Sequence, residues 1–229
     1  MTRTAVAAIL GAALVICCYY FVDRPVAWFF HQHSSPEHRF WFWAPRLSNW
    51  LKGGAAPALM LVLLWCLWRP GGRMQTVLLA LSASLVVTTG LKIVLKWTCG
   101  RYWPEPWHEG YPSLISNGAY GFHPFQRGAA YGAFPSGHAS LVCCCLSVLW
   151  LAYPRGRWFY ALACALVCAL LVAMNYHFVG DVVAGVLLGT ITGVYMAYLF
   201  RLQPPRGPGP DPAHTGTAAR AGSGSPGNR

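Results

Sequence analysis

The stretch Phe134–Ser140 reads FPSGHAS and runs directly into a long apolar segment. Pro135 and Ser136 stand where a helix N-terminus favours a fixed φ angle and a capping hydroxyl. Gly137 lets a ligand approach the backbone, and the unpaired N–H groups at a helix start bind anions such as phosphate. His138 on the same turn can donate or accept a proton near neutral pH. The stretch therefore predicts a helix that begins at an anion-binding site and carries a histidine there.

Composition indicates a membrane protein. Of the 229 residues, 55% are hydrophobic and only 10% are charged, whereas soluble domains carry about 25% charged residues. The formal net charge is +11, which in a soluble protein would favour nucleic acid as a partner. Here the basic residues stand at the ends of apolar segments, where they meet anionic lipid headgroups. We therefore expect an integral membrane protein that does not bind nucleic acid.

The apolar segments predict an all-α fold, a polytopic membrane protein with six transmembrane helices. Aromatic and basic residues alternate over residues 25–53, which is typical of short interfacial helices in the headgroup layer. We take residues 1–203 as one membrane domain and the Pro-, Gly- and Ser-rich residues 204–229 as a disordered tail. We expect Asp23, Arg24 and Pro25 to end the first span, and the second predicted span is the shortest. The six spans are residues 4–22, 54–68, 74–96, 138–153, 158–176 and 181–200.

The nine cysteines give no sequence sign of a metal or disulfide site. All except Cys99 fall within apolar segments, where cysteine behaves as a small hydrophobic residue. Their spacing matches neither a zinc motif nor a disulfide framework. We therefore expect no metal and no cofactor.

Six crossings would gather the polar residues that flank the spans on one side of the membrane. The third span ends, the fourth begins and the fifth meets the sixth on that side. Two short connections on the other side, residues 69–73 and 154–157, carry two arginines each, and cytoplasmic loops are enriched in such charges. We expect both termini in the cytoplasm and the polar cluster on the outer face, the periplasmic face of a bacterial inner membrane. The residues expected there are Lys92, Lys96, Arg101, Ser136, His138, His177 and Asp181.

His177 and Asp181 are four residues apart, so on a helix they share one face. A carboxylate bound to one imidazole nitrogen fixes the tautomer and leaves the other nitrogen to act as base or nucleophile. The alternative is a structural pair that closes a helix junction. With His138 the pair suits in-line phosphoryl transfer, in which one histidine attacks phosphorus and the other protonates the leaving oxygen. Lys96 and Arg101 would hold the equatorial oxygens, unless they only extend toward the lipid headgroups.

These motifs resemble the type 2 phosphatidic acid phosphatase family, which is related in its core to the vanadium haloperoxidases and glucose-6-phosphatase. The resemblance rests on Pro135-Ser136-Gly137-His138, on His177-x3-Asp181 and on Lys96 upstream of them, and it covers residues 90–195. It implies that His177 is the nucleophile that forms a phosphohistidine, that Asp181 orients it and that His138 is the general acid. It also implies that Lys96 binds phosphate together with Ser136 and Gly137.

Two arginines of the family pattern are absent from this sequence. Trp103 stands where the first is expected, and Leu171 stands where the second is expected. Hydrogen bonds to charged groups are worth about 1.5–3 kcal/mol each, so either other residues replace these arginines or the substrate differs from that of the family. We expect Arg101 to replace them first and Arg127 second, ahead of His123 and Asn175, and we expect Lys92 to matter little.

The resemblance implies a metal-independent hydrolase of phosphoric monoesters or anhydrides that acts on a lipid phosphate or pyrophosphate. Undecaprenyl pyrophosphate, phosphatidylglycerol phosphate and lipid A are substrates of the expected type, which would place the enzyme in the lipid metabolism of the cell envelope. Two alternatives remain open. One is a lipid phosphotransferase that uses the same site, and the other is a lipid-phosphate binding or transport protein without catalysis.

Overall fold

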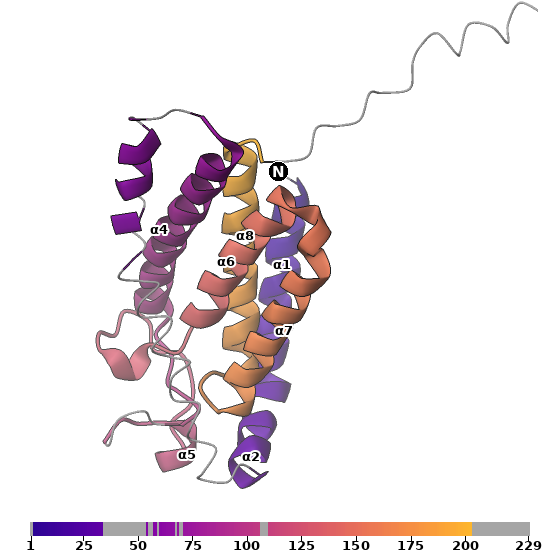
Figure 1. Ribbon diagram of the computed structural model, residues 1–229. Helices are drawn as coiled ribbons and strands as arrows, with labels where there is room; N and C mark the ends of the chain where they lie inside the picture. The colour runs from indigo at the N-terminus through magenta and orange to yellow at the C-terminus, as the bar shows by residue number, and fades with distance from the viewer. Residues whose placement is uncertain are drawn as a thin grey trace, which may run out of the picture.

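The computed structural model describes residues 2–33, 71–105 and 110–202, with separate residues and short pieces between 54 and 68. The secondary structure of these parts is helical, apart from isolated β-bridges between residues 101 and 132. The longer helices lie side by side in one bundle (Figure 1). The predicted all-α fold class is confirmed for the residues described.

The N-terminal helix is longer than the sequence predicted. α1 (Thr2–Cys17), a π-helical turn η1 (Cys18–Val22) and α2 (Asp23–His33) follow one another without a break. The predicted end of the first span at Asp23–Pro25 is therefore wrong. Proline has no N–H to donate and crowds the preceding helical turn, and the wider π-turn before α2 changes the hydrogen-bonding register at this point. The helix thereby continues past Pro25, and Asp23 lies inside a long, mostly apolar helical segment.

Four helical segments are long and apolar enough to cross a bilayer. They are Thr4–His33, α4 (Arg73–Cys99), Pro154–Ala173, in which η4 (Pro154–Gly156) leads into α7 (Arg157–Ala173), and α8 (Val179–Leu199). α6 (Gly137–Ala152) is apolar but has only 16 residues, about 24 Å at 1.5 Å per residue. Between 54 and 68 the described residues are helical. The structure therefore supports an integral membrane protein with four candidate spans, and the prediction of six is not confirmed.

The outward-facing side chains of these helices are apolar and large. Ile9 on α1, Leu91 on α4, Trp158 on α7 and Leu199 on α8 are all exposed. Extended apolar surface of this kind is rare on soluble monomers. In a bilayer it faces the acyl chains.

α6 and α8 pack backbone against backbone. Three glycines of α8 recur every fourth residue and meet three small residues of α6: Gly185, Gly189 and Gly193 lie against Ser136, Ser140 and Cys144. A Cβ atom at Gly185 would lie 2.6 Å from the carbonyl oxygen of Ser136, and Cβ atoms at the other two glycines would also collide with the α6 backbone. Small residues at this spacing let membrane helices approach closely. This packing sets the position of the first turn of α6 against α8.

The connection from α4 to α6 lies at one end of the bundle, the lower end in Figure 1. It contains α5 (Leu114–Asn117) and the 3-10 turn η3 (Ala129–Tyr131). It leaves α4 at Gly100, whose φ of 51° suits glycine and whose missing side chain makes room for the carbonyl of His123. The opposite end holds the start of α1 and the end of α8, where the hydroxyls of Thr4 and Tyr195 are 3.1 Å apart.

Two predictions fall on residues outside the described ones. Residues 34–53 include most of the predicted interfacial helices, and residues 203–229 include the predicted tail. The division into a membrane domain of residues 1–203 and a tail of residues 204–229 therefore stays a prediction.

Candidate active site

The two histidines singled out by the sequence lie close together. His138 is the second residue of α6, and His177 lies in the turn between α7 and α8. Their ring centroids are 6.1 Å apart, and Tyr176 lies within 5.1 Å of both rings. His138 is 9% exposed and His177 is 2% exposed. The expected meeting of the two imidazoles is thus present in a nearly closed environment.

Asp181 lies directly behind His177 and is fully buried on the first turn of α8. Its Oδ2 is 3.7 Å from Nδ1 of His177 and accepts a hydrogen bond from the backbone N–H of Phe178 at 3.1 Å. Its main-chain carbonyl accepts a hydrogen bond from the backbone N–H of Ser136 at 2.9 Å. The same residue therefore contacts the proposed nucleophile through its side chain and the start of α6 through its backbone.

Arg101 occupies a different place from the one predicted. Its side chain is fully buried, and its two terminal nitrogens donate to Asp181 at 2.6 Å and to Asp23 at 2.7 Å. Burial disfavours the charge, but the two carboxylates outweigh it and raise the pKa of Arg101. The expectation that Arg101 replaces a missing phosphate-binding arginine is not supported by this placement, because its terminal nitrogens are already bound to carboxylates.

Asp23 is a residue of the site that the sequence reasoning missed. It was interpreted as the end of the first span, but it is buried and accepts hydrogen bonds from Arg101 and from the backbone N–H of Gly180 at 2.9 Å. A Cβ atom at Gly180 would lie 3.1 Å from Oδ2 of Asp23, so any larger residue there would press on this carboxylate. An ionisable residue inside an apolar helix is itself a sign of function, and that signal was available in the sequence.

The start of α6 has the features of an anion site. Ser136 is the N-cap, and its Oγ accepts from the N–H of Ala139 at 3.4 Å. Lys92 of α4 is buried beside Gly137: a Cβ atom there would lie 3.1 Å from Cδ and 3.7 Å from Nζ of the lysine. The helix dipole and the lysine charge both favour an anion at this position. Lys92 is therefore closer to the predicted phosphate site than the sequence suggested.

Lys96 and Trp103 form the neighbouring side of the site. Nζ of Lys96 donates to the carbonyl of Gly132 and lies 5.5 Å from the Trp103 ring centroid. That ring lies 5.1 Å from the ring of His177, and its N–H donates to the carbonyl of Ala129 at 2.8 Å. An aromatic ring thus stands beside His177, at the position where the sequence motif leads us to expect an arginine.

The other predicted candidates lie in the connection, in the turn before α8 and on α7. Arg127 is exposed in the connection before η3. The ring of His123 lies edge-on to that of Tyr102, with the centroids 4.5 Å apart, while Asn175 is buried and donates to the carbonyl of Ala27 at 3.0 Å. Leu171, at the second position where the sequence motif leads us to expect an arginine, is buried in the packing of α6, α7 and α8.

Burial lowers the pKa of His177 below that of an ordinary histidine. Desolvation of the imidazolium is the main cause and the positive charge of Lys96 adds to it, whereas Asp181 and the backbone of Ala133 act in the opposite direction. The ring is therefore favoured in its neutral form near pH 7. That form has the lone pair that a nucleophile needs.

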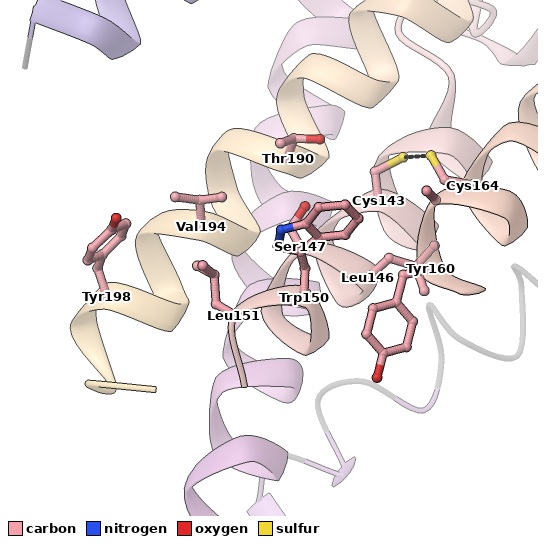
Figure 2. A pocket seen from close by; sticks show the side chains of 11 residues that line it. Cys143, Leu146, Ser147, Trp150, Leu151, Tyr160, Cys164, Thr190, Val194 and Tyr198 are labelled. Atoms are coloured by element: carbon pink, nitrogen blue, oxygen red, sulfur yellow. Dashed lines mark hydrogen bonds between the residues drawn. The ribbon is translucent and has the colours of Figure 1, made fainter. Parts of the chain in front are cut away.

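A cavity of about 460 Å³ lies elsewhere, between α6, α7 and α8 (Figure 2). Its lining includes Leu146, Trp150 and Val194 and none of the predicted site residues. Beside it the sulfurs of Cys143, Cys164 and Cys168 lie within 4.8 Å of one another, a set that offers ligands of the kind soft metal ions prefer. Sequence spacing could not reveal this group because it combines two helices.

Comparison with known proteins identifies the family. Residues 77–204 match the PAP2 superfamily, a segment that includes His138, His177 and Asp181. Lipid A 1-phosphatase of Rhizobium etli is 33% identical over 130 residues, 53% of this chain and 53% of its own length. The lipid A 1-phosphatase of Rhizobium johnstonii is 32% identical over 117 residues, 50% of this chain and 45% of its own length. The chain thus spans about half the length of these curated relatives.

One solved structure is also similar, the crystal structure of the first transmembrane PAP2 type phosphatidylglycerolphosphate phosphatase from Bacillus subtilis. It aligns with a TM-score of 0.48 and 15% sequence identity, over 88% of this chain and 96% of that one. The superfamily match covers more than half of the chain and carries both histidines. The protein therefore belongs to the PAP2 superfamily.

Proposed function

We propose that the protein is a membrane phosphatase that hydrolyses a lipid phosphate or pyrophosphate through a phosphohistidine and needs no metal. The observation that carries this proposal is the pair of imidazole rings 6.1 Å apart with the carboxylate of Asp181 behind one of them. Rings in this arrangement can flank a phosphoryl group, as in-line transfer requires. The two curated relatives are named lipid A 1-phosphatase, which supports a lipid phosphate as substrate.

In the first step, the imidazole nitrogen of His177 that faces away from Asp181 attacks phosphorus. An N–P bond forms, the bond from phosphorus to the lipid oxygen breaks, and His138 donates a proton to that oxygen. Asp181 stabilises the positive charge that the ring of His177 acquires. Its distance of 3.7 Å from Nδ1 is longer than a hydrogen bond, and such contacts often tighten only when substrate is bound.

In the second step, water attacks the phosphohistidine. His138, now neutral, takes a proton from the water, the N–P bond breaks, and inorganic phosphate leaves with His177 restored. A lipid hydroxyl in place of water would make the protein a phosphotransferase without any change in the protein groups. The products therefore distinguish these two functions.

We assign the phosphate oxygens to the start of α6 and to the two lysines of α4. The N–H groups at Gly137 and His138 lie at the positive end of the helix dipole. Lys92 beside Gly137 and Lys96 beside Trp103 supply charge. Arg127, exposed in the connection, stays a candidate for a lipid headgroup or for the phosphate itself, while Arg101 moves to a positioning role.

We further propose that the site faces the outside of the cell membrane. The histidines lie at the end of the bundle where α8 starts, and Arg73, Arg155 and Arg157 lie at the other end, where α4 and α7 start. Arginine near the ends of spans is enriched on the cytoplasmic side. This rule would put both chain termini in the cytoplasm and the histidines on the periplasmic face of a bacterial inner membrane.

The test is phosphate release by purified protein in detergent with EDTA present. Lipid A, phosphatidylglycerol phosphate and undecaprenyl pyrophosphate would be compared, with lipid products identified by mass spectrometry. We expect the wild-type protein to release phosphate and the His177→Gln variant to release none. We also expect an acid-labile phosphoprotein intermediate, which should form less efficiently in the His138→Gln variant. Full activity of His177→Gln would remove the proposed nucleophile. Lipid binding without turnover of any substrate would instead favour a non-enzymatic binding or transport protein.

A further inference from the structure

Three buried charges form a chain behind the proposed nucleophile. Arg101 lies between Asp23 on α2 and Asp181 on α8, with nitrogen–oxygen distances of 2.7 Å and 2.6 Å. All three side chains are fully buried. Aromatic rings surround the guanidinium carbon at 4.4–5.4 Å, namely those of Phe178, Phe122, Tyr19 and Tyr120. The guanidinium is thereby shielded from water, so its charge is screened less than it would be at the surface.

The balance of charge in this chain decides what His177 experiences. An Arg101–Asp181 pair alone would be neutral, so the arginine would cancel most of the field with which Asp181 stabilises a positive imidazole. With both carboxylates ionised, the second one, Asp23, makes the sum of the three charges −1. Formation of the phosphohistidine places positive charge on the ring of His177, and this charge needs a negative partner in a medium of low polarity.

We propose that Asp23 is a positioning residue that keeps the group behind His177 at a net charge of −1. It holds Arg101 on the side away from the histidine and leaves Asp181 negative enough to stabilise the phosphorylated ring. The inference rests on the proposed function and deepens it, because it gives the N-terminal helix a part in the chemistry. That helix lies outside the segment matched to the superfamily, residues 77–204.

Contacts of Asp23 support a role at the site and not only in helix packing. Its Oδ1 accepts from the N–H of Gly180, which is the residue directly before Asp181. Its Oδ2 accepts from Arg101. Asp23 thus binds both the backbone that carries Asp181 and the cation that pairs with it. A substitution at Asp23 should reach His177 through these two contacts.

Other charged and titratable groups also surround His177, from every element packed against it. Those that face His177 are His138 on α6, Lys96 on α4, Tyr176 in the same turn and Asp181 on α8. Arg101 in the connection and Asp23 on α2 lie behind Asp181. The cation Lys96 and burial both disfavour a proton on His177, and Asp181 favours one. Asp23 adds a second negative charge behind Asp181, and a negative charge there favours a proton on His177.

The experiment compares Asp23→Asn, Asp23→Glu and the double variant Asp23→Asn/Arg101→Gln. Asparagine keeps the shape of the side chain but removes its charge. In Asp23→Asn we expect the acidic limb of the kcat/KM profile to move to lower pH by about one unit, because a charge near His177 has been removed. We expect kcat to fall about 10- to 100-fold, the range typical of groups that orient a catalytic side chain.

The double variant separates charge balance from structure. Removing Asp23 and Arg101 together leaves Asp181 with a net charge of −1, so the acidic limb should return toward its wild-type position. Asp23→Glu keeps the charge and should leave the limb in place. An acidic limb of the kcat/KM profile that stays unshifted in Asp23→Asn would overturn the inference. So would a double variant in which the activity losses of the two single substitutions simply add.

A second readout does not depend on turnover. The ¹⁵N chemical shifts of His177, assigned by their loss in His177→Gln, report its pKa directly in wild type and Asp23→Asn. We expect a lower pKa in Asp23→Asn, and equal values would overturn the inference even if the variant had lost activity. Wild-type protein that releases no phosphate from any substrate would overturn the proposed function, whereas active wild type with unshifted His177 would overturn the role of Asp23 alone.

Discussion

The first turn of α6 and the later turns of the same helix differ in what they face. The first turn carries His138 against His177, beside charged and polar groups that are almost completely buried. The later turns, around Leu146 and Trp150, border a cavity of about 460 Å³ with an apolar lining (Figure 2). Empty volume and chemistry thus occur at different places on one helix. In this bundle the convergence of ionisable side chains, and not the size of a cavity, marks the candidate site.

The largest effect that this comparison predicts is at His177. His177→Gln should lower turnover by about 10³-fold or more, because no other group would form the covalent intermediate. Ser147→Ala, at the cavity on the same bundle, should leave turnover within about twofold, as is usual for substitutions away from a site. Phosphate release from the best lipid substrate measures both. A stronger effect at Ser147 than at His177 would place the chemistry in the cavity instead.

Arg101→Met should give the next largest effect, and mainly on folding. It leaves two buried carboxylates without their cation, a change that costs about 3–5 kcal/mol for buried ion pairs. Thermal unfolding in detergent should show a clearly lower Tm. Arg127→Ala is the matched control: its exposed side chain should leave Tm unchanged and raise KM if it binds headgroups. An Arg101 variant with wild-type Tm and only a raised KM would restore its predicted role as a phosphate ligand.

Gly189→Ala should have an intermediate effect. The added Cβ would collide with the backbone of Ser140, and such overpacking costs about 1–3 kcal/mol. Gly90→Ala on α4 provides the control, because a Cβ there would meet nothing within 4 Å. The unfolding temperature and the turnover should both fall in Gly189→Ala and stay at wild-type values in Gly90→Ala. Equal behaviour would show that α6 and α8 are not in backbone contact in the membrane.

The smallest effect is a dependence of stability on pH. The pKa of His177 is lowered in the folded protein, so the unfolded chain takes up a proton first as the pH falls below about 6.5. Stability is thus full above that pH and falls below it by up to about 1.4 kcal/mol per pH unit. His177→Gln should lose this part of the dependence. Unfolding between pH 7.5 and 5.5 tests it, and parallel curves for both proteins would contradict the buried, neutral state of His177.

The general plan of the site could be predicted from the sequence because it follows from local patterns. The capping residues before α6 and the spacing of His177 and Asp181 are readable over a few positions. The alternation of apolar segments then requires that their polar ends gather on one side. The structure brings the two histidines and the start of α6 together as these patterns predict, and the roles of these residues stay a prediction.

The pairing of Arg101 could not be predicted in the same way. Its partners Asp23 and Asp181 lie 78 and 80 residues away along the chain. The residues next to Arg101 in the sequence do not distinguish an arginine in a buried ion pair from one that binds a ligand. Asp23 and Pro25 were interpreted as the end of a span because both residues normally disfavour a membrane helix. A π-turn before Asp23 lets the helix continue despite that local preference. The continuous helix places Asp23 beside Arg101.

The glycine contacts between α6 and α8 bear on how the protein would respond to different lipids. A bilayer that is thicker or thinner than the protein makes helices tilt. Helices in direct backbone contact tilt together as one body, so the distance between His138 and His177 should be insensitive to acyl-chain length. Lys96, on α4, is held instead by the connection, through the carbonyl of Gly132 and the ring of Trp103, so its distance to the phosphate follows the position of the connection and not that of the α6–α8 pair. Lipid composition would then change substrate affinity before it changed the rate of the chemical step.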